Sequence, residues 1–148
     1  MTKPITAPGA KLIIKLGDGA TPEVFTAPCG INTRGINFTK ATNETNVPDC
    51  ADPEAPSWTE RGIVSMSTEV SGNGVLAMEN LTNWQAFLDS TVSKNCQIWI
   101  DVPSTDHGGH WDGKFHLTGF NVTGEIGNKV QAAITMQSDG PVTWTPVP

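Results

Sequence analysis

Residues 62–78 carry the longest alternation of apolar and polar side chains, and this pattern restricts the fold more than any other feature. One set of alternate positions is Val64, Met66, Thr68, Val70, Gly72, Gly74, Leu76 and Met78; the other is Ile63, Ser65, Ser67, Glu69, Ser71 and Asn73. Successive side chains of a β-strand point to opposite faces. The alternation therefore predicts a strand pair or one long strand, with a bulge or bend at the two glycines.

The same pattern recurs near the C-terminus. In residues 114–126 the polar positions are Asn121, Thr123 and Glu125, and in residues 130–137 they include Gln131, Thr135 and Gln137. Further strands are expected at residues 10–16, 23–27 and 96–102. A sheet with one apolar face and one face of small polar residues covers a core on one side and meets water on the other. The fold class predicted is therefore mainly β.

Only residues 79–94 show helical periodicity. Leu81, Trp84, Leu88 and Val92 recur at spacings of three and four, and Asn80 is suited to the N-cap. A chain of 148 residues forms one domain. We expect a single domain over 1–148, with an extended N-terminal arm at 1–9 and an extended C-terminal tail at 140–148.

The segment around residues 42–57 is poor in large apolar side chains and contains Pro48, Pro53 and Pro56. It is predicted to be a long loop, and long loops in compact domains are often functional. It is the first candidate for a contact with a partner. Residues 104–113 are polar and rich in glycine and are expected to form a turn.

Charge excludes several classes of protein. The net charge is −6 and the nine basic residues are scattered, whereas nucleic-acid binding by charge needs clusters of lysine and arginine. No apolar run approaches the ~20 residues that cross a bilayer, and the N-terminus has no apolar signal-peptide core. We expect a chain that is made in a cytosol and is not inserted into a membrane.

Catalytic and metal-binding patterns are weak. His107, His110 and His116 lie near Asp106 and Asp112, but the spacing matches no zinc motif, and exposed turn histidines are the simpler interpretation. The carboxylates at 49, 52 and 54 lack the glycine and final glutamate of a calcium loop. Phosphate-binding, dinucleotide-binding and nucleophile-elbow motifs are absent. The sequence predicts no enzyme, no cofactor and no metal.

Three cysteines do not suggest a disulfide scaffold. Cys96 opens a predicted strand and is expected to be a buried apolar residue. Cys29 and Cys50 could form a disulfide if residues 30–49 double back. The cytosolic start argues against that bond, and oxidation after release from a cell would permit it.

Residues 29–99 resemble the major tail tube proteins of long-tailed bacteriophages, including the tails of gene transfer agents. Three stretches carry the resemblance: Cys29-Gly30, TNETNVPDCADPEAPSWTERG at 42–62, and VSGNGVLAMENLTNWQAFL at 70–88. They hold an Asp-Cys-x-x-Pro loop, a Trp-x-Glu-Arg segment, a strand punctuated by glycines and a helix with tryptophan. The histidine-rich turn matches no part of this pattern.

The resemblance implies a β-sandwich or partial barrel with a helix on one flank. Six subunits would join their sheets into a ring with an inner β-barrel, and rings would stack into a hollow, non-contractile siphophage-type tail tube that delivers genomic DNA. Implied partners are further copies of the chain, a tape-measure protein, and tail-tip and tail-terminator proteins. DNA would pass through without specific binding. Assembly would take place in the host cytoplasm, and the final location would be the virion tail.

Two sets of residues receive roles on this basis. Polar strand faces are expected to line the lumen, where like charge would repel phosphate; they comprise Ser67, Glu69, Ser71, Asn73, Thr123, Glu125, Gln131, Thr135 and Gln137. The long loop is expected to contact a neighbouring subunit or ring through Asn43, Thr45, Val47, Asp49, Asp52, Glu54 and Trp58.

Three other functions remain as alternatives. A subunit of a bacterial secretion-system tube would form rings in the same way. A monomeric carbohydrate-binding β-sandwich would fit the tryptophans and acidic loops. A metal hydrolase would have to be built on the histidine turn.

Overall fold

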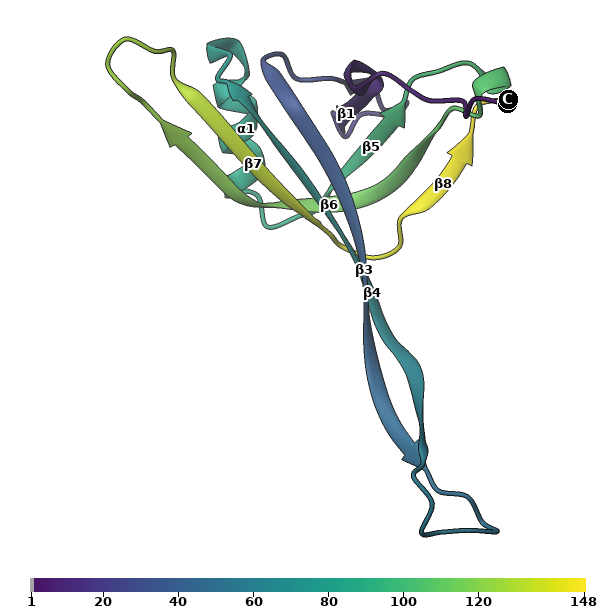
Figure 1. The fold of residues 1–148 in the computed structure, drawn as a ribbon. Coiled ribbons are helices and arrows are strands. Elements are labelled where there is room, and N and C mark those ends of the chain that lie inside the picture. Colours follow the sequence, from purple (N-terminus) through teal and green to yellow (C-terminus); the bar gives the residue numbers. More distant parts are fainter. Residues whose placement is uncertain (1) are drawn as a thin grey trace.

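A computed structural model describes residues 2–148 and shows one antiparallel sheet of eight strands with a single α-helix (Figure 1). The order across the sheet is β2-β1-β5-β6-β7-β4-β3, and β8 pairs with β6. The elements are β1 (Leu12–Gly17), β2 (Phe25–Thr26), β3 (Ile31–Val47), β4 (Trp58–Val75), α1 (Met78–Asp89), β5 (Lys94–Ile100), β6 (Gly109–Thr123), β7 (Gln131–Ser138) and β8 (Thr143–Pro146), with short 3₁₀ turns at Gly9–Lys11 and Ser104–Asp106. The predicted mainly-β class is confirmed.

Strand β6 connects the two parts of the sheet, because its two halves pair with different strands. Its first half pairs with β5 and β8, and its second half pairs with β7. The sheet curves until its opposite ends approach, and the Nη1 of Arg34 on β3 donates a hydrogen bond of 2.8 Å to the carbonyl of Leu12, the first residue of β1. The body is thus one continuous curved sheet, a partly closed barrel, and not a pair of separate sheets.

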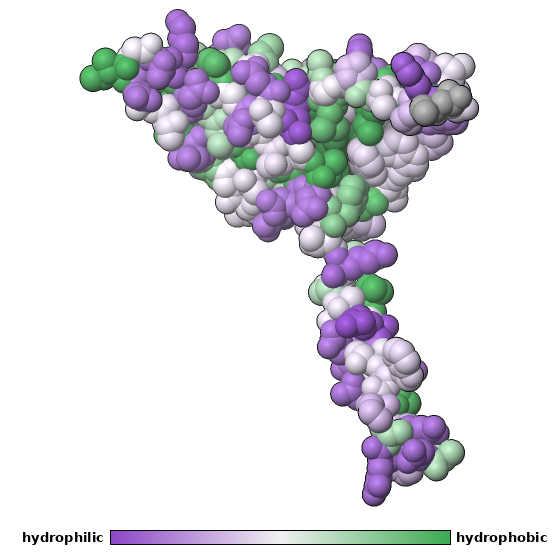
Figure 2. All heavy atoms as spheres, in the orientation of Figure 1, coloured by the Kyte–Doolittle hydropathy of each residue, from purple (hydrophilic) through white to green (hydrophobic). Residues whose placement is uncertain are grey.

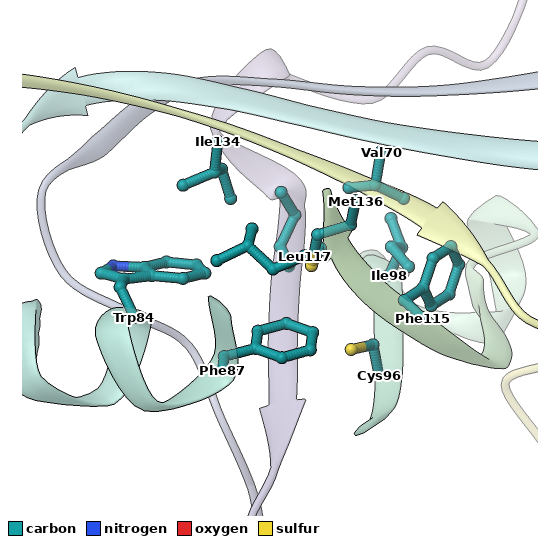
Figure 3. Packing of buried hydrophobic residues seen from close by; sticks show 10 residues of the cluster. Val70, Trp84, Phe87, Cys96, Ile98, Phe115, Leu117, Ile134 and Met136 are labelled. Atoms are coloured by element: carbon teal, nitrogen blue, oxygen red, sulfur yellow. The ribbon is translucent and has the colours of Figure 1, made fainter. Parts of the chain in front are cut away.

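The core fills the inside of this curve (Figure 3). Strands β4 to β7 contribute Val70, Ile98, Phe115, Ile134 and Met136, all at most 2% exposed. Helix α1 closes the open side with the buried Trp84 and Phe87. Burying this apolar surface is the main force that holds the sheet in its curve.

The alternation in residues 62–78 is confirmed where β4 crosses the body. Burial alternates from Thr68 to Leu76, and Val70 is 0% exposed. A side-chain carbon at Gly74 would collide with the carbonyl of Gly30, so glycine is needed for the close approach of the two backbones. The predicted irregularity lies opposite this point, at a shift in register between Ile31 and Thr33 of β3.

The predicted long loop at 42–57 is wrong. β3 and β4 remain paired down to Val47 and Trp58, and only residues 48–57 form a loop. The hairpin projects from the body as a long arm (Figure 1). We call residues 42–63 the arm. Both of its faces meet water, so it needs no apolar alternation; it is held by the ladder and by exposed pairs such as Arg61 with Glu44 at 3.2 Å.

The helix boundaries also differ from the prediction of 79–94. α1 ends at Asp89, and Val92 lies beyond it and is exposed. The hydroxyl of Ser90 accepts a hydrogen bond of 3.1 Å from the backbone N–H of Val92, a local bond that competes with helix formation. The N-cap is Ala77, and Asn80 lies inside the first turn.

The turn expected at 104–113 is found only in the first part of that segment. Ser104–Asp106 form a 3₁₀ turn and His107 has a φ of 64°, but β6 already begins at Gly109. A side chain at Gly109 would meet the ring of Trp144, so this glycine allows β8 to pack closely. Within the C-terminal tail, Thr143–Pro146 form β8, which pairs with β6.

Candidate assembly surfaces

The residues predicted to line a lumen come together on one face of the sheet. The register aligns Glu69 with Gln137, Ser71 with Thr135 and Val75 with Gln131, and Gln131 with Thr123. Of the nine residues predicted, Ser67, Glu69, Ser71, Asn73, Thr123, Gln131, Thr135 and Gln137 lie on strands of this sheet. Glu125 lies in the loop between β6 and β7.

Strand β3 extends the same face with residues that the sequence reasoning missed. Thr33, Asn37 and Thr39 lie opposite Asn73, Glu69 and Ser67. The hydroxyls of Thr39 and Ser67 are 2.9 Å apart, which is a hydrogen bond. Polar residues at 33, 37 and 39, with a glycine at 35, were the signal for this strand face. We call the outer face of β3, β4, β7 and the second half of β6 the polar wall.

The polar wall carries little charge. Among the side chains of this face only Glu69 and His116 are ionisable, because Arg34 and Lys40 of β3 occupy the alternate positions; the other residues of the face are mainly hydroxyl, amide and glycine positions. The net charge of −6 therefore resides mostly elsewhere, so repulsion of phosphate by the wall is a smaller effect than the composition implied. What distinguishes the wall is its lack of lysine and arginine.

The polar wall ends in two unpaired strand edges. Within residues 2–148, β3 pairs only with β4, and residues 116–123 of β6 pair only with β7. Each pair from β3 through β4 and β7 to β6 is antiparallel, so β3 and β6 also run antiparallel to each other. Exposed edges are templates for pairing with another chain. A row of identical copies can thus continue the same antiparallel sheet.

The predicted contact residues all lie on the arm. Asn43, Thr45 and Val47 belong to β3, Trp58 begins β4, and Asp49, Asp52 and Glu54 lie in the tip. The side chain of Trp58 is 88% exposed, and its cross-strand partner Val47 is also exposed. Between 42 and 63 the arm carries five carboxylates and one arginine. It therefore presents an acidic surface with one exposed apolar pair, Val47 and Trp58, where the strands meet the tip loop.

The cysteine bridge considered from the sequence is wrong for a single chain. Cys29 and Cys50 are free and exposed, and Cys96 is free and buried. The 17-residue strand β3 separates the first two, which at ~3.3 Å per residue is roughly 50 Å. A disulfide requires Cα atoms within about 7 Å.

Thiol reactivity provides a direct check. At pH 8 a maleimide should label two thiols per folded chain, Cys29 and Cys50, and a third only after denaturation. Burial raises the pKa of the Cys96 thiol from 9.0 to about 12, so in the native state this thiol stays protonated and unreactive. The unfolded chain ionises first, and folding stability should fall as pH rises from 9 toward 12. Labelling of only one thiol in the native protein would contradict this.

The histidines do not converge on a metal site. His110 stacks on Trp99 with ring centroids 4.2 Å apart and its Nε2 lies 2.8 Å from a carboxylate oxygen of Asp112, while His116 lies 3.4 Å from Asp139. Within residues 2–148 no group of three or more His, Cys, Asp or Glu side chains is placed to bind a metal ion. No helix in that range is both long and apolar enough to span a bilayer.

A polar sheet face flanked by free edges and an acidic arm agrees with the comparison to known families. The family model described as phage tail tube protein matches residues 6–144. The chain belongs to the phage tail tube protein family. The resemblance seen in residues 29–99 is thereby confirmed and extends over nearly the whole chain.

Solved structures share the fold of this tail tube protein. One is a chain from the tail of an empty gene transfer agent particle, computed with helical refinement in C6 symmetry. It is 23% identical, with a TM-score of 0.73, and the match covers 95% of this chain and 99% of that one. A chain of a contractile injection system, the PVC sheath–tube complex, is 15% identical with a TM-score of 0.63 and coverages of 96% and 93% for this chain and that one.

A third similar structure is the SPP1 tail tube. It is 11% identical, with a TM-score of 0.55, and the match covers 95% of this chain and 80% of that one. Among curated proteins no sequence matches. The family assigns the tail tube protein a structural role in the virion tail, where it forms the tube, and it is not an enzyme.

Proposed function

We propose that six copies join side by side into a ring, with the free edge of β3 in one copy paired to the free edge of β6 in the next. The observation that carries this proposal is the polar wall ending in two edges of opposite strand direction. A closed sheet leaves no unpaired edge, which removes the hazard that such edges present in a monomer. The number six follows the C6 symmetry of the similar gene transfer agent tail.

The polar wall then faces the lumen of a barrel to which each copy gives four strands. Ser71, Asn73, Thr135 and their neighbours offer small neutral groups, and the polar face itself carries no lysine or arginine. Tight binding of DNA depends on cations that neutralise phosphates. A wall without them lets genomic DNA slide through unhindered.

The acidic arm extends beyond the body and provides contact with a neighbouring subunit or ring. Trp58 and Val47, the strand pair next to its tip loop, supply apolar surface that the isolated chain leaves in water. Stacked rings make a hollow tail tube that is assembled in the host cytoplasm around a tape-measure protein. Tail-tip and tail-terminator proteins bind its two ends.

Electron microscopy of the purified protein over a range of concentrations tests this function. Rings or hollow tubes with sixfold symmetry are the expected result. A chain that stays monomeric even with tail-tip and tape-measure partners present would contradict it. A stable monomer that bound glycans would favour a carbohydrate-binding module instead.

The lumen assignment predicts the behaviour of a charge reversal. In Glu69→Lys tubes every ring should carry six new lysines on its inner wall, and the tubes should retain short double-stranded DNA at low salt. Retention should fall steeply as salt rises, because binding releases counterions. The matched variant Glu69→Gln removes the carboxylate without adding a cation and should retain none. Equal retention by both variants would show that residue 69 does not face the lumen.

A further inference from the structure

A shallow groove lies where the arm leaves the body, between β3, β4 and the turn from β7 to β8. Its volume is about 400 Å³, and Phe38, Met66, Pro141 and Val142 give it an apolar lining. Phe38 and Met66 are 48% and 72% exposed. In Figure 2, hydrophobic atoms gather on the body just above the point where the arm leaves it. Lys40 also lines the groove and makes no ion pair within residues 2–148.

A complementary feature stands at the other end of the body, in the loop of residues 124–130. The side chain of Ile126 has a relative exposure of 104%, so it is fully in water. Gly127 has a φ of 92° and reverses the chain directly after it, which leaves Ile126 at the tip. The neighbouring Glu125 forms no ion pair within the described chain. The tip is therefore an apolar residue beside a carboxylate that accepts a hydrogen bond from Asn128 but has no cationic partner.

The loop and the groove lie at opposite ends of the same strand. β7 begins just after the loop, at Gln131, and ends at the groove, where Ser138 and Gly140 line it. In Figure 1 the loop between β6 and β7 is at the upper left, and the other end of β7 lies near the point where β3 and β4 leave the body. A head-to-tail stack of copies along the strands therefore brings the loop of one copy to the groove of the next without a change of shape.

We propose that Ile126 of one copy enters this groove on a copy in the adjacent ring, where Glu125 pairs with Lys40. The inference rests on the proposed tube. Burying the isoleucine removes apolar surface from water on both partners, and the two unpaired charges have opposite signs. The contact joins different patches on the two copies, and such a heterologous contact repeats without limit along one axis. The contact fixes the position of one ring relative to the next.

Substitutions at the loop tip test the apolar half of this contact. Ile126→Asp and Ile126→Asn should leave the circular dichroism spectrum and the rings intact but raise the critical concentration for tube growth at least about tenfold, since the burial of one such side chain is worth that much. Ile126→Leu should grow normally. Wild-type growth by Ile126→Asp would overturn the inference. A wild-type chain that forms neither rings nor tubes would instead defeat the proposed function.

A charge exchange tests the ion pair. Lys40→Glu and Glu125→Lys should each slow tube growth, and the double variant should recover it. Single variants that grow as the wild type does, or a double variant that does not recover growth, would remove the pair from the contact.

Cross-linking identifies the occupant of the groove. In a chain with Cys29→Ser and Cys50→Ser, the pair Ile126→Cys and Met66→Cys should give a ladder of multimers with a short bismaleimide. If Trp58→Cys gives the ladder with Met66→Cys and Ile126→Cys does not, the groove holds the arm tip and the inference is wrong.

Discussion

Replacing residues 43–62 with a two-residue Asn-Gly turn should abolish tube assembly and leave the body folded. Thr42 and Ile63 are cross-strand partners, so the short turn closes a hairpin that is already in register. None of the deleted residues belongs to the buried core. The melting temperature should therefore change little, while electron microscopy should show no tubes at concentrations at which the wild type assembles.

A milder variant separates the arm strands from the tip. Trp58→Ala removes the large exposed side chain and keeps the hairpin, and it should weaken assembly without preventing it. Tubes of normal length from the deleted chain would show that the arm is dispensable, and the contacts between copies would then lie wholly on the body.

Phe115→Ala should destabilise the protein more than any change on its surface. The side chain is 0% exposed and lies in β6, next to partners in both β5 and β7. Truncating a buried phenylalanine costs about 3–5 kcal/mol, out of a total of about 5–15 kcal/mol for a domain of ordinary stability. Urea unfolding followed by circular dichroism measures the loss.

The matched control is again Trp58→Ala, which truncates a larger aromatic residue at an exposed position. Its free energy of unfolding should stay within about 0.5 kcal/mol of the wild type. A similar loss in both variants would mean that the arm tip is buried against the body in solution.

The sequence predicted the polar wall well because every second residue of β4 and β7 reports burial directly. Val70 and Met136 are fully buried, and Ser71 and Gln137 beside them are exposed. A strand with one buried face and one exposed face has apolar and polar residues at alternate positions in the sequence. The identity of the exposed face followed without knowledge of the pairing.

The arm could not be predicted in this way. Both of its faces are wet, so burial imposes no alternation, and its stabilising pair Glu44 and Arg61 is 17 positions apart. A bulge between positions 63 and 65 also shifts the alternation by one residue. The condition for a bridge between Cys29 and Cys50 is not met for a related reason, because residues 31–47 form one extended strand that keeps the two cysteines apart.

The sequence reasoning placed His110 in a turn, whereas it lies on strand β6. The reason is that glycine occurs both in turns and where two segments pack closely. Gly108 and Gly109 precede His110 and suggested a turn, but here they allow close packing against Val102 and Trp144. Composition alone does not separate these two roles of glycine.

The arm also determines what recruitment of a subunit costs in conformational entropy. A loop of this length that became ordered only on contact would lose about 1–2 kcal/mol for each residue fixed. Here residues 42–47 and 58–63 are already paired before any neighbour arrives. Ordering these two strand segments therefore adds no conformational-entropy cost when a subunit joins the tube.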